Sequence, residues 1–82
     1  MRYWQPKLRS VVPGEWIMFN GSRRIAIIRR VTAGTPAQPM LYAETWAEQP
    51  DERSMIGYFP EDRLRFAADV VWTEYRRAVE GG

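Results

Sequence analysis

Four short stretches of the chain are rich in β-branched and aromatic residues and are separated by turn-forming residues, which predicts four strands. The expected strands cover Glu15 to Phe19, Arg23 to Val31, Met40 to Trp46 and Met55 to Phe59. Asn20-Gly21 lies between the first two strands. This dipeptide is typical of a type I′ hairpin turn, because both central residues of that turn need positive φ. We therefore expect the first two strands to pair antiparallel.

The carboxyl-terminal stretch has the periodicity of a helix. We expect Pro60 at its first position, with the carboxylates of Glu61 and Asp62 at the positive end of the helix dipole, and an end at Val79 or Glu80. At about 100° per residue its apolar side chains form one stripe. The stripe contains Leu64, Ala67, Ala68, Val71, Tyr75 and Ala78. The chain is therefore predicted to be an α+β protein, with an antiparallel sheet of three or four strands and this one helix packed on one face.

The amino-terminal residues show no clear period. Residues 1–13 contain Arg2, Lys7 and Arg9 beside the aromatic pair Tyr3-Trp4. We interpret them as an extended basic arm, with a frayed terminus or an extra edge strand as the alternative. Residues 14–82 are expected to form a single domain, which is a normal size for one small core.

The composition argues against several classes of chemistry. The 82 residues include no Cys and no His, which removes disulfides, the usual general base and most metal-ligand sets. No Ser has a plausible base and no glycine-rich phosphate loop is present, so we expect a non-catalytic protein without cofactor or metal. No run approaches the roughly 18 apolar residues that a membrane span needs, which predicts a cytoplasmic protein.

Arginine is concentrated at both ends of the second expected strand, in Arg23-Arg24 and Arg29-Arg30, although the net charge of the chain is only +2. Strand alternation separates Arg23, Ile25, Ile27, Arg29 and Val31 from the other set, Arg24, Ala26, Ile28 and Arg30. The first set is more apolar, so we assign it to the core. Eleven of the 12 basic residues are Arg, which reflects either selection for bidentate contacts or a GC-rich coding sequence.

On this assignment the sheet presents arginine and aromatic side chains away from the helix. The third strand adds Met40, Tyr42, Glu44 and Trp46 to that face and places Leu41, Ala43 and Thr45 beneath the helix. The first strand can add Trp16 and Met18 to the same face. Guanidinium groups bind phosphate and aromatic rings stack on bases, which favours nucleic-acid binding. The expected contacts are Arg24, Arg30, Tyr42 and Trp46, with Arg2, Lys7 and Arg9 from the arm. The alternative is that these arginines pair with Glu15, Glu44 or Glu48 as ordinary surface groups.

A family resemblance covers roughly residues 23–78. The order strand, strand, strand, helix, with Ile56-Gly57-Tyr58-Phe59 before a helix that carries Ala67-Ala68, resembles the AP2-like DNA-binding fold of plant factors and of phage integrase arm-binding domains. The resemblance implies a sheet that lies in the major groove and a phage or mobile-element origin. By position it also implies DNA contacts from Arg24, Arg30 and Trp46.

The outer face of the expected helix supports a second function. Phe66 and Val70 lie opposite the buried stripe, Arg77 follows along the same line, and Trp72 lies beside them. An exposed apolar strip flanked by charges is either ordinary surface or a partner contact. The alternative is therefore a protein-interaction module or inhibitor that uses Phe66, Val70, Trp72 and Arg77, or an unpaired sheet edge, and that can form a homodimer.

Overall fold

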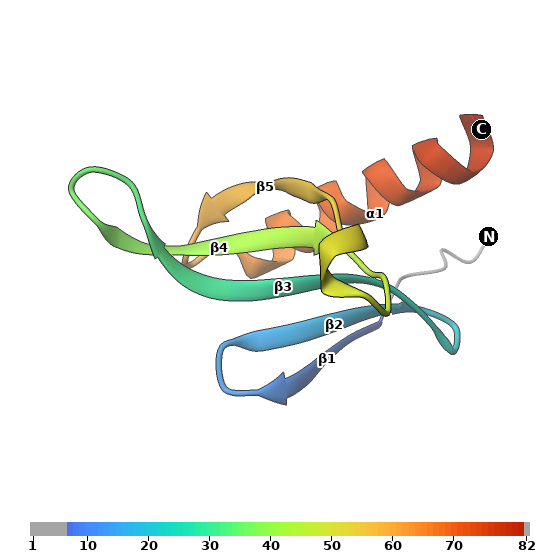
Figure 1. The fold of residues 1–82 in the computed structure, drawn as a ribbon, viewed down its shortest axis with the longest axis horizontal. Coiled ribbons are helices and arrows are strands. Elements are labelled where there is room, and N and C mark those ends of the chain that lie inside the picture. The colour runs from blue at the N-terminus through green and yellow to red at the C-terminus, as the bar shows by residue number, and fades with distance from the viewer. Residues whose placement is uncertain (1–6, 82) are drawn as a thin grey trace.

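The computed structural model describes residues 7–81, which form one antiparallel sheet and one helix (Figure 1). The sheet strands lie in chain order: β1 (Lys7–Val12), β2 (Glu15–Asn20), β3 (Arg23–Ala33), β4 (Gln38–Thr45) and β5 (Met55–Pro60). A short 3-10 helix, η1 (Pro50–Glu52), lies between β4 and β5, and α1 (Leu64–Gly81) follows β5. The α+β class with a carboxyl-terminal helix is confirmed, but the sheet has five strands rather than three or four.

The additional strand is β1, which comes from the stretch interpreted as an arm. Its Leu8 lies opposite Met18 of β2 and packs against the core, while Lys7 lies opposite Phe19. Residues 7–12 thus form an edge strand, which was the alternative interpretation. The arm interpretation is wrong for these residues because backbone pairing and the burial of Leu8 hold them to the sheet. Arg2 and the rest of residues 1–6 lie outside the described part of the chain.

The β2–β3 hairpin turns one residue later than the sequence suggests. Asn20 still belongs to β2 and lies opposite Arg23, so Gly21 and Ser22 are the two loop residues. Gly21 has φ of 64°, and no non-glycine residue within 7–81 has positive φ. Positive φ at the first loop position alone is the pattern of a type II′ turn, so the type I′ prediction is wrong.

The helix begins later than expected. Pro60 is the last residue of β5, opposite Met40, and α1 starts at Leu64. The Arg63 amide donates a hydrogen bond of 3.0 Å to the Pro60 carbonyl, which closes a turn that contains Glu61 and Asp62. Proline is tolerated here because β5 is an edge strand and one side of its ladder needs no donor. The two carboxylates therefore belong to the turn, and their predicted role in the first helical turn is wrong.

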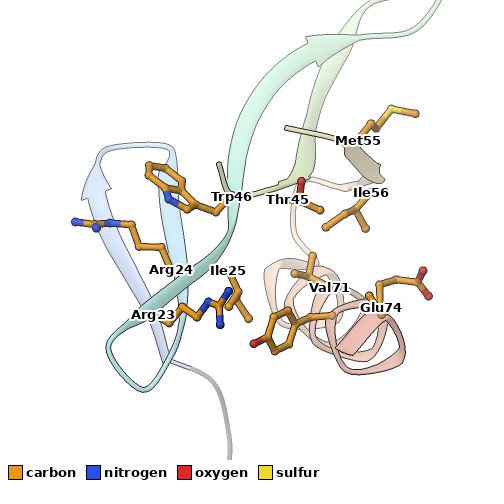
Figure 2. A pocket seen from close by; sticks show the side chains of 11 residues that line it. Arg23, Arg24, Ile25, Thr45, Trp46, Met55, Ile56, Val71 and Glu74 are labelled. Atoms are coloured by element: carbon orange, nitrogen blue, oxygen red, sulfur yellow. The ribbon is translucent and has the colours of Figure 1, made fainter. Parts of the chain in front are cut away.

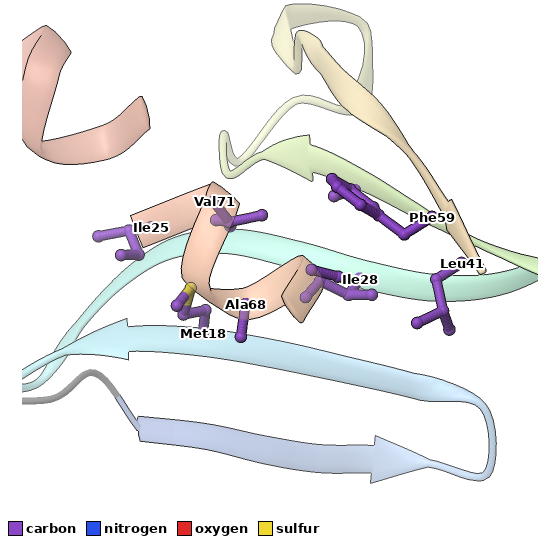
Figure 3. Close-up of a cluster of buried hydrophobic side chains, with 10 residues drawn as sticks. Met18, Ile25, Ile28, Leu41, Phe59, Ala68 and Val71 are labelled. Carbon is purple, nitrogen blue, oxygen red and sulfur yellow. The ribbon is translucent and has the colours of Figure 1, made fainter. Parts of the chain in front are cut away.

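The hydrophobic core lies between α1 and one face of the sheet (Figure 3). The sheet contributes Met18, Ile28, Leu41 and Phe59, and the helix contributes Ala67, Ala68 and Val71 from the predicted stripe. Trp16 packs against this core beside Met18, so the expectation that these two side chains join the face away from the helix is wrong. Ala67 is fully buried, so its small side chain lets the helix approach the sheet closely. Residues 76–80 are all exposed, because the last turns of α1 extend past the sheet (Figure 1).

Over most of β3, the face that lies toward the helix is the opposite of the predicted one. Ile28 lies opposite Ala43, and Arg30 lies opposite Leu41, whose side chain is fully buried beneath α1. Directly opposed residues share a face, so Ala26, Ile28 and Arg30 lie on the helix side. Ile27, Arg29 and Val31 lie on the other side. The predicted faces of β3 are therefore wrong for these residues, whereas those of β4 are confirmed.

A β-bulge at Ile25 explains this error. Met18 pairs with Ala26 and Phe19 pairs with Arg24, which leaves Ile25 without a partner on β2. The extra residue reverses the alternation, so both Ile25 and Ala26 lie toward the helix while Arg24 stays on the far side, as predicted. A pattern read at constant period two cannot contain this shift.

Candidate nucleic-acid interface

We call the sheet face that is turned away from α1 the open face. Its side chains form rows that cross the strands, and three of these rows carry charged residues. These three rows are Lys7, Phe19 and Arg24; then Arg9, Ile17, Ile27, Glu44 and Met55; then Glu15, Arg29, Tyr42 and Tyr58. Trp46 and Arg53, from the β4–β5 connection, join the end of the face next to Arg24 and Glu44. The open face thus combines five cations with aromatic rings.

Glu44 lies in the middle of the open face and is almost completely covered. Its side chain is only 10% exposed, with Arg29 Nη2 at 3.2 Å and Arg53 Nη1 at 3.8 Å from the same carboxylate oxygen, Oε2. Arg53 is held in place because its Nε donates a hydrogen bond of 2.8 Å to the Ala47 carbonyl. Two guanidinium groups therefore compensate the one buried carboxylate, so its repulsion of an approaching phosphate is weakened.

Aromatic rings position the remaining arginine side chains. The Arg24 guanidinium lies 5.8 Å from the centre of the Phe19 ring and 5.6 Å from that of Trp46. Arg53 lies 4.3 Å from the same Trp46 ring. Such cation–π contacts orient a guanidinium without using its hydrogen-bond donors. Arg24 therefore keeps its donors available at the surface.

A second aromatic cluster lies toward β5. The rings of Tyr42 and Tyr58 are 5.1 Å apart, and the Arg29 guanidinium lies 5.5 Å from the Tyr42 ring. Burial raises the pKa of the Tyr42 hydroxyl above its ordinary value of 10.0, and the Glu44 carboxylate that accepts its hydrogen bond raises it further. The Arg29 charge acts in the opposite direction. Tyr42 is therefore a neutral hydrogen-bond donor to the central carboxylate.

Three cations of the open face form no ion pair with any carboxylate of residues 7–81: Lys7, Arg9 and Arg24. Lys7 and Arg9 also line a shallow depression of about 320 Å³, together with Phe19, Gly21 and Ser22. Cations without an intramolecular carboxylate partner are available for an external anion. This corner of the sheet has the uncompensated positive charge.

The predicted nucleic-acid residues divide into three groups. The open face holds five of them: Lys7, Arg9, Arg24, Tyr42 and Trp46. Arg30 is not one of them, because it lies on the helix side with its Nε 3.4 Å from Glu61 Oε2; its predicted place on the open face is wrong. Arg2 lies outside the described residues.

Sequence reasoning missed two cations of this face. The apolar pattern of β3 predicts Arg29 on the core side because that pattern does not contain the bulge at Ile25, whereas the register with Tyr42 places Arg29 on the open face. Arg53 lies in a polar connection with no period, so no pattern linked it to the sheet. Only the contacts with Glu44 and Trp46 show that it belongs there.

The residues of the alternative site do not form one exposed strip. Phe66 is 50% exposed, and its ring lies in a T-shaped arrangement with the Phe59 ring, with the ring centres 5.9 Å apart. Val70 and Trp72 are partly buried against the core, so the expectation that Val70 faces solvent is wrong. Arg77 pairs with Glu74 at 3.0 Å. The apolar surface on this side is therefore reduced to Phe66 and its immediate surroundings.

Within residues 7–81 no helix has the length and apolar character required to cross a membrane. The same residues contain no group of three or more acidic side chains that could hold a metal ion. No protein-family model, no curated protein and no solved structure matches the chain.

Proposed function

We propose that the protein is a small non-catalytic module that binds nucleic acid through the open face. The observation that supports this most strongly is the position of Lys7, Arg9 and Arg24, three neighbouring cations without an internal ion pair, on one face of the sheet. Phosphate contacts supply most of the affinity of such proteins, and Arg and Lys are the side chains that make them. Trp46 adds π surface beside Arg24, and Tyr42 and Tyr58 add π surface beside Arg29 on the same face.

The distribution of charge on the sheet favours this function over a neutral interface. The open face and its border carry five cations but only two carboxylates among the described residues, Glu15 and Glu44. Glu44 is covered and already neutralised by two arginines. An approaching polyanion therefore meets the uncompensated corner around Arg24 rather than the carboxylate.

The fold suits the proposed ligand because the open face is made of paired strands rather than of loops. A sheet face of this kind can lie in a major groove, as the AP2-like resemblance implies, or can support single-stranded bases. An origin in a phage or mobile element is part of the same proposal. It is motivated by the β-β-β-α order and the Gly57-Tyr58-Phe59 strand end.

A salt titration tests this proposal. Tryptophan fluorescence is used to measure binding to mixed-sequence duplex DNA and to single-stranded DNA and RNA pools over a series of salt concentrations. We expect log affinity to fall linearly with log salt, with a slope of about 0.9 for each phosphate contact on duplex DNA. Absence of binding to every pool at low salt, or binding that does not respond to salt, would contradict the proposal.

A protein-interaction module remains the second candidate, because Phe66 is a half-exposed aromatic side chain on the helix surface. In this candidate the Phe66 ring, supported from below by Phe59, docks on a partner or on a second copy. Large exposed aromatic side chains are frequent anchors of such contacts. The unpaired edges of β1 and β5 are the other surfaces that could pair with another chain.

A further inference from the structure

A groove separates the carboxyl-terminal half of α1 from the adjoining ends of β3, β4 and β5 (Figure 2). Its volume is about 420 Å³, which lies within the range of small-molecule sites. The walls are mainly apolar and come from Ile25, Ile56, Val71, Tyr75 and Ala78, with Arg23 and Glu74 among the polar lining residues. The groove lies on the helix side of the sheet and reaches the border of the open face, where Arg24, Trp46 and Met55 also line it.

Two β-bulges direct isoleucine side chains into this groove. Ile25 is the unpaired residue between Met18–Ala26 and Phe19–Arg24. Ile56 is the unpaired residue between the pairs Ala43–Gly57 and Glu44–Met55. In Figure 2 both side chains flank Val71 of the helix. Because a bulge re-aims a side chain at the expense of ladder hydrogen bonds, two bulges that converge on one groove indicate a constructed site.

The wall formed by Tyr75 is held in position on two sides. Its hydroxyl accepts a hydrogen bond of 3.2 Å from Asn20 Nδ2 at the end of β2, and its ring stacks on Trp72 at 5.5 Å with an interplanar angle of 22°. A ring restrained in this way cannot easily rotate into the groove and fill it. The groove is therefore preformed, which lowers the cost of binding.

The charges at the groove are unequal. Glu74 is neutralised by Arg77 at 3.0 Å, whereas Arg23 is exposed and forms no ion pair with any described carboxylate. Arg24 also borders the groove, but its guanidinium points away from the groove, toward Phe19 and Trp46 (Figure 2). Arg23 is therefore the cation that remains available to a ligand with an apolar body and one negative group.

From these observations we propose that the groove binds a small amphipathic anion, with its apolar part between Ile25, Ile56 and Val71 and its carboxylate or equivalent group at Arg23. This site goes beyond the proposed nucleic-acid function and does not depend on it. The ligand class is a medium-length alkyl or aryl carboxylate, since the groove is apolar along its walls and cationic at one position.

The test uses decanoate below its critical micelle concentration and decyltrimethylammonium as a cation of equal chain length. Binding is measured by heteronuclear NMR, which reports on Ile25, Ile56 and Tyr75 individually. We expect decanoate to shift these resonances and to bind more tightly than the cation. Arg23→Gln should lower the affinity for decanoate by about fivefold. The affinity for the cation should stay unchanged or increase slightly. Arg65→Gln, an exposed arginine outside the groove lining, is the matched control and should change neither affinity.

Ala78→Trp is the second variant, because Ala78 lines the groove from an exposed helix position where a large side chain can fill the space without entering the core. It should abolish binding of both probes while the circular dichroism spectrum stays unchanged. Equal affinity of the wild type and Ala78→Trp for decanoate would overturn the proposal. So would an Arg23→Gln variant that prefers decanoate over the cation as strongly as the wild type does. A third result would also contradict the proposal: decanoate does not bind, and the wild type self-associates whereas Ala78→Trp does not. That result would assign the groove to a second copy of the chain.

Discussion

The carboxylate of Glu44 is held by Arg29, with Nη2 3.2 Å from Oε2, although their strands bring Arg29 opposite Tyr42 and not opposite Glu44. The contact is therefore diagonal across the β3–β4 pair, and the Arg29 guanidinium also lies 5.5 Å from the centre of the Tyr42 ring. Arg53 completes the arrangement from the β4–β5 connection at 3.8 Å. This cluster joins the sheet to a segment that has no regular pairing with it.

Removal of the Glu44 charge should therefore destabilise the fold. In Glu44→Gln, Arg29 and Arg53 remain close to each other without the compensating carboxylate. We expect the free energy of unfolding to fall by about 1–3 kcal/mol, as measured by urea denaturation. Glu80→Gln is the control, since the Arg76–Glu80 pair is more than half exposed and its loss should cost less than about 0.5 kcal/mol. Equal losses in both variants would show that the Glu44 cluster does not stabilise the sheet.

Stability should also decrease in alkaline solution through Tyr42. The pKa of its hydroxyl is raised in the folded state, so its contribution to stability is complete below its unfolded pKa of about 10 and is lost as the pH rises through the folded pKa. Tyr42→Phe removes the ionisable group. We expect the difference in unfolding free energy between wild type and Tyr42→Phe to be constant from about pH 7 to 9 and to shift in favour of the variant above about pH 10. A difference that does not change with pH would contradict the assignment.

The uncompensated corner of the open face should control nucleic-acid affinity. The triple variant Lys7→Gln, Arg9→Gln, Arg24→Gln should weaken binding and reduce the salt slope by up to about 2.7, since each lost phosphate contact removes about 0.9. Arg30→Gln is the matched control because Arg30 lies on the helix side and pairs with Glu61. If Arg30→Gln weakens binding as much as the triple variant does, the contact surface is not the open face.

The second candidate function makes a separate prediction about Phe66. If the helix surface mediates self-association, light scattering should show a concentration-dependent increase in mass for the wild type, and Phe66→Ser should remain monomeric. Val79→Ser is the control, because Val79 is similarly exposed but lies more than three turns further along α1. A monomeric wild type at all concentrations would exclude a homodimer through Phe66 and leave only a different partner.

Local pattern was sufficient for the class of the fold. The runs that became β2, β4 and β5 are short, apolar and bounded by turn residues, and the stripe of Ala67, Ala68 and Val71 identifies the helix face that meets the sheet. The sequence does not locate the first turn of the helix, because Pro60 suits both the start of a helix and the end of an edge strand. The edge strand β1 was an open alternative because its single buried anchor, Leu8, is too little to define a period.

Strands β2 to β5, the helix and the concentration of arginine near one hairpin are therefore predictable from the sequence alone, because they depend on interactions between near neighbours. The grouping of the arginines on a common face depends on the tertiary structure. Ile25, Ile27 and Ile28 are all buried, so the apolar pattern of β3 does not distinguish its two faces, and a single bulge at Ile25 reverses the alternation. The pairing of β3 with β2 and β4, which lie elsewhere in the chain, places Arg24 and Arg29 on the open face and Arg30 beside the helix.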